Sequence, residues 1–156
     1  MKLLEGKVAL ITGGSRGIGE ALVRKFAEHG ASVAFTYISA ASKERSEKLA
    51  AELLPAIASG EGGQAVKPYQ SDAGDYTQAE SLISQVVKDF GKLDIVINNA
   101  GITRDTLMLR MTEQQWDEVI QTNLKSVFNL TKHALKPMIR AGGSIINMSS
   151  VVGVFG

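Results

Sequence analysis

The sequence predicts an α/β protein built on a doubly wound parallel sheet, truncated to about five strands. Short apolar runs alternate along the chain with segments whose apolar residues recur every three or four positions. Buried parallel strands and amphipathic helices produce these two patterns. The first apolar run, Val8 to Ile11, leads directly into the spaced glycines Gly13, Gly17 and Gly19 and then into a helical pattern. Right-handed crossovers between successive strands favour the doubly wound topology.

The first half of the chain is expected to contain three strands and three helices. Ile18, Leu22 and Phe26 recur at four-residue intervals and define the apolar side of the first helix, which Gly30 is expected to cap. Pro55 is expected to kink or shorten the second helix. The strands are expected at 8–11, 32–37 and 64–69, and the helices after the glycines, from about 42 to 58 and over 82–90, with a loop at 59–63.

The second half is expected to contain two more strands separated by a long helical segment. The strand at 93–97 runs straight into a polar turn, Asn98 to Gly101. Thr112 and Gln115 have the spacing of a capping box, which predicts a helix start. Trp116, Val119 and Ile120 are expected to form the buried face of that helix, with the tryptophan in the core. The helix is expected to continue through 124–135 and to stop at the glycines 142–143, before a fifth strand at 144–148.

Composition limits the class of protein. With 156 residues the chain is expected to form one domain, residues 1–156. The net charge is +1 without a block of like charges, so neither a nucleic acid nor a membrane surface is an expected partner. There is no cysteine and there are two histidines far apart, so no metal site is expected. The short, charged start does not resemble a signal peptide, and a cytoplasmic protein is expected.

The glycine-rich turn is a candidate phosphate-binding site of the Rossmann type. A strand that turns tightly into a helix directs unpaired backbone N–H groups and the positive end of the helix dipole at one point. Gly13 would let the chain turn, Gly17 would let a pyrophosphate approach the backbone, and Gly19 would let the helix lie close to the strand. Taken alone, the motif is equally compatible with a tight turn that binds nothing.

The residues after the second strand favour NADP over NAD. In this fold an acidic residue about twenty positions beyond the glycines usually holds the ribose 2′-hydroxyl of NAD. Here the stretch from Thr36 to Ser42 contains no acid, and the first one is Glu44. Arg16, with Ser39 and Lys43, can pair with the 2′-phosphate of NADP instead. The alternative for Arg16 is a solvated surface charge.

Four stretches together resemble the short-chain dehydrogenase/reductase family. They are Thr12-Gly-Gly-Ser-Arg-Gly-Ile-Gly19, Asp72, Asn98-Asn-Ala-Gly101 and Ile145-Ile-Asn-Met-Ser-Ser150, and the resemblance covers the whole chain. More narrowly, the stretches 98–111, 116–128 and 149–153 look like those of the β-ketoacyl-(acyl-carrier-protein) reductases. That resemblance implies NADPH-dependent reduction of a 3-oxoacyl-(acyl-carrier-protein) thioester to the 3-hydroxyacyl form in fatty-acid synthesis, by a homotetramer.

The resemblance also implies roles for particular residues. Asp72 would accept a hydrogen bond from the adenine amino group, although it can also serve as a charge at a helix start, as can Asp75. The turn at 98–101 would line the adenosine and ribose side, its alternative being a simple polar turn. The implied cofactor-binding residues are Thr12, Gly13, Ser15, Arg16, Gly17, Ile18, Gly19, Ser39, Asp72, Ala73, Asn99, Ala100 and Gly101.

Two further residues match the catalytic positions of the family. Ser150 matches the serine that hydrogen-bonds the substrate carbonyl, and its spacing fits better than that of Ser149. Asn123 matches an asparagine that lies at a helix distortion and positions a water; the alternative is a polar residue facing solvent.

The family's proton donor is a tyrosine followed four residues later by a lysine, and this chain has no such pair. We therefore expect the cofactor-binding half of a reductase, inactive by itself. A reductase of another carbonyl compound and a non-catalytic NADP-binding module are the alternatives.

Overall fold

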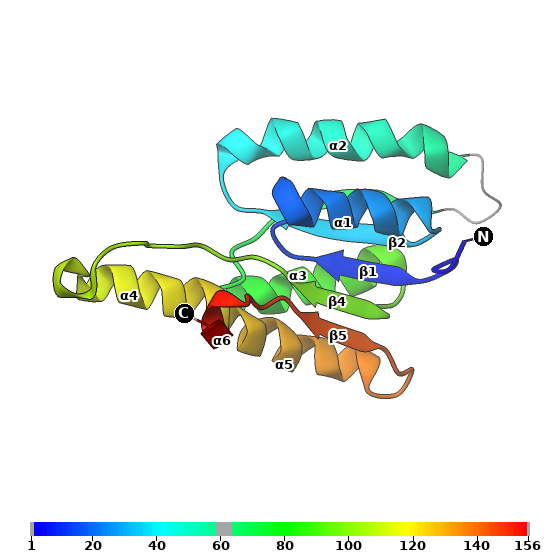
Figure 1. Cartoon of the computed structure of the whole chain (residues 1–156). Coiled ribbons are helices and arrows are strands. Elements are labelled where there is room, and N and C mark those ends of the chain that lie inside the picture. The colour runs from blue at the N-terminus through cyan, green and yellow to red at the C-terminus, as the bar shows by residue number, and fades with distance from the viewer. Residues whose placement is uncertain (1, 59–63, 156) are drawn as a thin grey trace.

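The computed structural model describes the backbone of residues 2–58 and 64–155 and the side chains of residues 2–53 and 64–153, so the loop expected at 59–63 lies outside the described residues. Five parallel strands form one sheet in the order β3-β2-β1-β4-β5, with helices on both faces (Figure 1). The predicted doubly wound α/β fold is confirmed. The strands are β1 (Val8–Ile11), β2 (Ser32–Tyr37), β3 (Val66–Gln70), β4 (Ile95–Asn98) and β5 (Ser144–Asn147).

The helices end close to the predicted positions, but α3 begins at Tyr76, six residues before the expected 82. The continuous helix expected from Thr112 is interrupted by a π-helical turn at Gln121–Lys125. Helix α2 starts two residues earlier than expected and continues past Pro55 to Ala58, so the proline does not end it. Gly30 has a φ of 93° and lies one residue beyond the actual cap, His29. The helices are α1 (Gly17–Glu28), α2 (Ala40–Ala58), α3 (Tyr76–Phe90), α4 (Glu113–Ile120), α5 (Ser126–Met138) and α6 (Val152–Phe155), with a 3-10 turn η1 (Met108–Arg110) and a π-helical turn η2 (Gln121–Lys125).

The strand order creates a crevice beside β1. From β1 the chain adds β2 and then β3 on one side, and it returns to place β4 against the other side of β1. Ile11, the last residue of β1, is paired with Ile97 of β4. In sheets of this kind ligands bind at the carboxyl ends of the strands where the order reverses. The glycine turn that follows β1 lies at this position.

Two apolar cores, one on each face of the sheet, hold the helices in place. Leu10 points into the core formed with α3 and α5, and the next residue, Ile11, points into the core formed with α1 and α2, as strand alternation requires. Figure 1 shows α1 and α2 above the sheet and α5 below it, and α3 packs into the same core as α5. Helix residues buried in these cores are Val23, Ala27, Leu49 and Ala50 on one face and Ala79, Leu82, Ile83, Val86, Leu130, Ala134 and Met138 on the other.

Two of the predicted helix faces differ from the observed ones. Ile18 is 65% exposed because the first turn of α1 borders a pocket rather than the sheet, whereas Leu22 and Phe26 do pack against the core. The predicted buried face of α4 is wrong: Trp116 is 54% exposed and Ile120 is 37% exposed. Periodicity identifies the apolar side of a helix but does not show that another element covers it.

Candidate functional site

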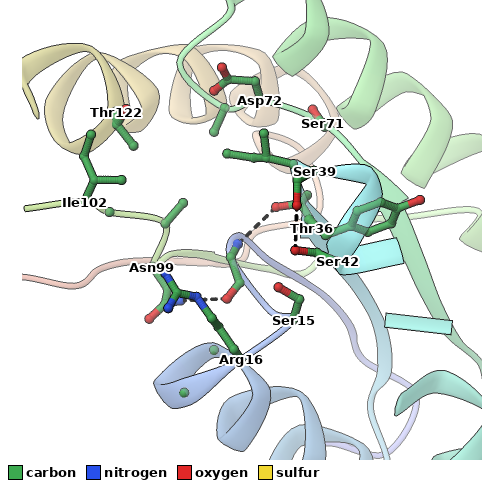
Figure 2. Close-up of a pocket in the computed structure, with 18 of the residues that line it drawn as sticks. Ser15, Arg16, Thr36, Ser39, Ser42, Ser71, Asp72, Asn99, Ile102 and Thr122 are labelled. Atoms are coloured by element: carbon green, nitrogen blue, oxygen red, sulfur yellow. Dashed lines mark hydrogen bonds between the residues drawn. The ribbon is translucent and has the colours of Figure 1, made fainter. Parts of the chain in front are cut away.

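A pocket with a volume of about 430 Å³ opens at the carboxyl ends of β1, β2 and β4 (Figure 2). This volume lies in the range of small-molecule sites. The pocket brings together most of the predicted cofactor-binding residues; Thr12, Lys43 and Asn98 do not line it. Eight further lining residues carry no sequence signal for a cofactor site; they are Thr36, Tyr37, Ile38, Ser42, Ser71, Gly74, Ile102 and Thr122.

The glycines of the turn are needed for their backbone conformation or for close approach. Gly13 and Gly17 have φ values of 65° and 57°, in the left-handed region that side chains disfavour. A Cβ on Gly19 would collide with the carbonyl oxygen of Gly13 and would lie 2.7 Å from Nδ2 of Asn99. The turn therefore leaves its backbone open to the pocket above Gly17, where a Cβ would meet no atom within 4 Å.

Thr12 holds the pocket wall from behind and does not line the pocket, contrary to its predicted role as a contact residue. It is 1% exposed. Its Oγ1 accepts hydrogen bonds from the backbone N–H of Asn99 (3.0 Å) and of Ala100 (2.9 Å). Nδ2 of Asn99 donates to the carbonyl oxygen of Thr12 at 2.9 Å. On the other side, the N–H of Gly13 donates to Oγ1 of Thr36 at 3.0 Å. Side chains from β2 and β4 thus hold the glycine turn between them.

The charge distribution of the pocket favours an anionic ligand at the glycine turn. Arg16 is the N-cap of α1, its side chain makes no capping hydrogen bond, and it is the only cation among the described lining residues. The positive end of the α1 dipole lies at the same place. Glu44 lines a separate groove between α1 and α2. Lys43, predicted as a further phosphate contact, does not line the pocket; its Nζ lies 3.8 Å from Oε1 of Glu47.

The two aspartates that follow β3, Asp72 and Asp75, have different roles. Asp75 is the N-cap of α3 and accepts a hydrogen bond from the N–H of Gln78 at 2.8 Å. Asp72 lines the pocket, where its Oδ1 accepts the N–H of Gly74 at 2.8 Å. Capping of the helix is therefore the role of Asp75, and Asp72 is the one of the two that lines the pocket.

Asn123 lies in the π-helical turn η2 and pairs with the loop after β4. Its Oδ1 accepts the N–H of Ile102 at 2.8 Å, and its Nδ2 donates to the carbonyl oxygen of Ile102 at 2.9 Å. The expected helix distortion is confirmed. The side chain is exposed, as the solvent-facing alternative expects, and it is also bonded to Ile102. Thr122, the preceding residue, lines the pocket.

Ser150 is not among the residues that line the pocket. It follows β5, and its Oγ accepts the N–H of Val152 at 3.3 Å. The three tyrosines have different surroundings. Tyr69 lies outside the pocket and donates to Asp89 at 2.7 Å; burial and this acceptor raise its pKa. The ring of Tyr76 packs edge-on against His133, and Tyr37 lines the pocket near the end of β2.

The described part of the chain contains neither a membrane-spanning helix nor a cluster of metal ligands. Among its helices, none has the combination of length and hydropathy that a transmembrane span requires. Within residues 2–58 and 64–155, no group of three or more histidine or acidic side chains is arranged to hold a metal ion.

Curated relatives share sequence over nearly the whole chain. The 3-oxoacyl-(acyl-carrier-protein) reductase FabG of Staphylococcus aureus is 47% identical over 151 residues, which is 96% of this chain and 58% of the relative. FabG of Thermotoga maritima is 46% identical over 154 residues, 98% of this chain and 59% of the relative. The chain thus spans less than two thirds of the length of these relatives.

Solved structures show the same fold. A double mutant of a Serratia marcescens short-chain dehydrogenase/reductase matches with a TM-score of 0.85 and 36% identity, over 95% of this chain and 57% of that chain. A metagenomic blue fluorescent protein in complex with NADPH matches with a TM-score of 0.79 and 36% identity, over 86% of this chain and 52% of that one. The family model for short chain dehydrogenases matches residues 7–156. The chain belongs to the short-chain dehydrogenase family.

Proposed function

We propose that the pocket binds NADP(H), with the pyrophosphate at the glycine turn and the adenine on the side of Asp72 and Ala73. The proposal rests on the charge of the side chains at the place where the ribose 2′-phosphate of NADP(H) would lie. Arg16 lines the pocket, as do Ser39 after β2 and Ser42 in the first turn of α2, and no carboxylate lines that end of the pocket among the described residues. A carboxylate there would repel a 2′-phosphate, whereas a guanidinium binds it. Residues 1–156 then form the dinucleotide-binding domain.

We further propose that the protein containing this chain reduces 3-oxoacyl-(acyl-carrier-protein) thioesters in fatty-acid synthesis, in the cytoplasm and as a homotetramer. The FabG relatives support this substrate through their identities of 46–47%. Bound NADPH supplies the hydride. Ser150 hydrogen-bonds the substrate carbonyl, and Asn123 holds the loop at Ile102 and positions a water.

The chain by itself lacks a general acid. None of Tyr37, Tyr69 and Tyr76 is followed four residues later by a lysine. A free tyrosine has a pKa near 10 and needs a neighbouring cation to donate its proton efficiently at neutral pH. Residues 1–156 alone should therefore bind cofactor without turnover, since loss of a general acid costs roughly 10²–10⁴ in rate.

The cofactor proposal is tested by replacing Arg16 with alanine. We expect the affinity for NADPH to fall about tenfold, as for the loss of one exposed charge-assisted hydrogen bond, and the affinity for NADH to change little. Fluorescence titration with both cofactors measures this. Lys43→Ala is the control, because this cation lies outside the pocket. Equal losses for NADPH and NADH would contradict the assignment of Arg16 to the 2′-phosphate.

A further inference from the structure

The π-helical turn η2 is bonded to two segments of the pocket wall at once. Nε2 of Gln121, its first residue, donates a hydrogen bond to the carbonyl oxygen of Gly74. Asn123, two residues later, bonds both backbone groups of Ile102. Side chains two residues apart on a helix do not face each other, so the two reach different segments. Thr122, between them, lines the pocket; Figure 2 shows it beside Ile102 and across from Asp72.

The contact between Gln121 and Gly74 is close, and Asn129 of α5 bonds the same carbonyl oxygen of Gly74. Asn129 of α5 is 0% exposed, and its Nδ2 donates to the carbonyl oxygens of Ala73 (3.0 Å) and Gly74 (3.1 Å). A Cβ on Gly74 would lie 3.2 Å from Cγ and from the carbonyl oxygen of Gln121. The segment 72–74 therefore rests directly on η2 and α5, and a displacement of one requires a displacement of the other.

We propose that η2 couples the two ends of the pocket and that Gln121 is a positioning residue for Asn123. This inference rests on the proposed binding of NADP(H). Gln121 does not line the pocket, so it acts through Gly74 on the adenine side. When a ligand occupies the surface of Asp72 and Ala73, it restrains Gly74, and through Gln121 it restrains the turn that holds Ile102.

The backbone N–H of Ile102 reports on this coupling because its acceptor is Oδ1 of Asn123. We use adenosine 2′,5′-bisphosphate as the probe, since it fills the adenine side and has no nicotinamide. In the unmodified chain, saturating probe should slow hydrogen exchange at the Ile102 amide about two- to tenfold, the range for stabilising its existing hydrogen bond by the net free energy of one such bond. NMR-detected exchange measures this without any turnover.

The test replaces Gln121 in two ways. Gln121→Leu removes the donor at similar size, and Gln121→Glu removes it while keeping a polar side chain, so one variant suffices if the other does not fold. The control is Gln114→Leu, because the amide of Gln114 donates to Glu118 on the exposed side of α4, away from this pocket. Both Gln121 variants should still bind the probe, but the slowing of exchange at Ile102 should disappear. It should persist in Gln114→Leu.

Three outcomes overturn the inference, and they are distinguishable. Slowing that persists in the Gln121 variants would mean that the loop 99–102 senses the probe directly. Bound probe without slowing in the unmodified chain would mean that the two ends are independent. Both results leave the proposed cofactor site intact. Failure of the unmodified chain to bind the probe would remove the proposed function together with the coupling.

Discussion

Two regions of the molecule have similar amphipathic patterns and very different surroundings. The inner region is the sheet with α1, α2 and α3, and the outer region is the outer face of α4, η2 and α5. In the first region, large apolar side chains such as Phe35 and Val23 are fully buried. In the second, Leu124 and Phe128 are more than half exposed. Helix α5 contacts α3 through a different side, which contains Asn129, Leu130 and other buried residues. Amphipathicity therefore predicts where a helix can be buried, and only its neighbours decide whether it is.

The outer face has a groove where the inner region has a filled core. An apolar groove of about 670 Å³ runs along η2 and α5. Lys132 lies at its rim, with Nζ 5.6 Å from the ring centre of Phe128, a distance at which a cation–π contact forms. The apolar residues of the groove are Ile120, Leu124, Val127, Phe128 and Leu135.

The largest expected effect is a difference in unfolding free energy when two phenylalanines, one from each region, are replaced by alanine. Phe35→Ala should lower the free energy of unfolding by about 3–5 kcal/mol, because it opens a cavity in a filled core. Phe128→Ala should cost less than about 1 kcal/mol, because 56% of that residue is already exposed. Denaturant unfolding of residues 1–156 measures both. Similar losses for the two variants would show that the outer face is buried in solution.

Trp116 provides a spectroscopic check of the same comparison. It is the only tryptophan of the chain and is 54% exposed on α4. Its emission should be red-shifted, as in water, and acrylamide should quench it readily in the folded state. Unfolding should then change the quenching only slightly. Strong protection from acrylamide in the native chain would place Trp116 in a contact that the described residues do not provide.

The smallest expected effect is a difference in pKa between one carboxylate of each region. Asp89 of α3 accepts hydrogen bonds from Lys67 (2.9 Å), Tyr69 (2.7 Å) and Gln85 (2.8 Å). These donors, Lys67 first, lower the pKa of Asp89 to about 2. Because the native pKa lies below the unfolded value of about 3.9, the stabilisation is complete above pH 4 and is lost as the pH falls through about 2.

The matched group in the outer region is Glu118, whose pKa is lowered mainly by the hydrogen bond from Arg104. On acidification Asp89 should therefore protonate at lower pH than Glu118, and Lys67→Met should raise the pKa of Asp89. Carbon-detected NMR titration of both carboxyl groups measures these values. A pKa of Asp89 near 3.9, unaffected by Lys67→Met, would show that the contacts do not persist in solution.

Local signals in the sequence predicted several details of the site. The capping box of Thr112 and Gln115 is confirmed, with both of its hydrogen bonds present. The glycine spacing identified the turn at the pocket. Thr36 and Ser71 were missed because a threonine in a strand and a serine after one are ordinary residues. Their place at the pocket follows from the alignment of β2 and β3 at one edge of the sheet.

By itself, the sequence determined the alternation of strands and helices, the glycine turn and the helix start at Thr112. These features depend on residues close together in the chain, such as a cap and its N–H three residues on. Only the tertiary structure decided that Thr12 lies behind the pocket wall, that Asn123 pairs with Ile102 and that Trp116 is exposed. Those properties depend on which segments meet in space, and the free energy of a side chain is set by the atoms that surround it.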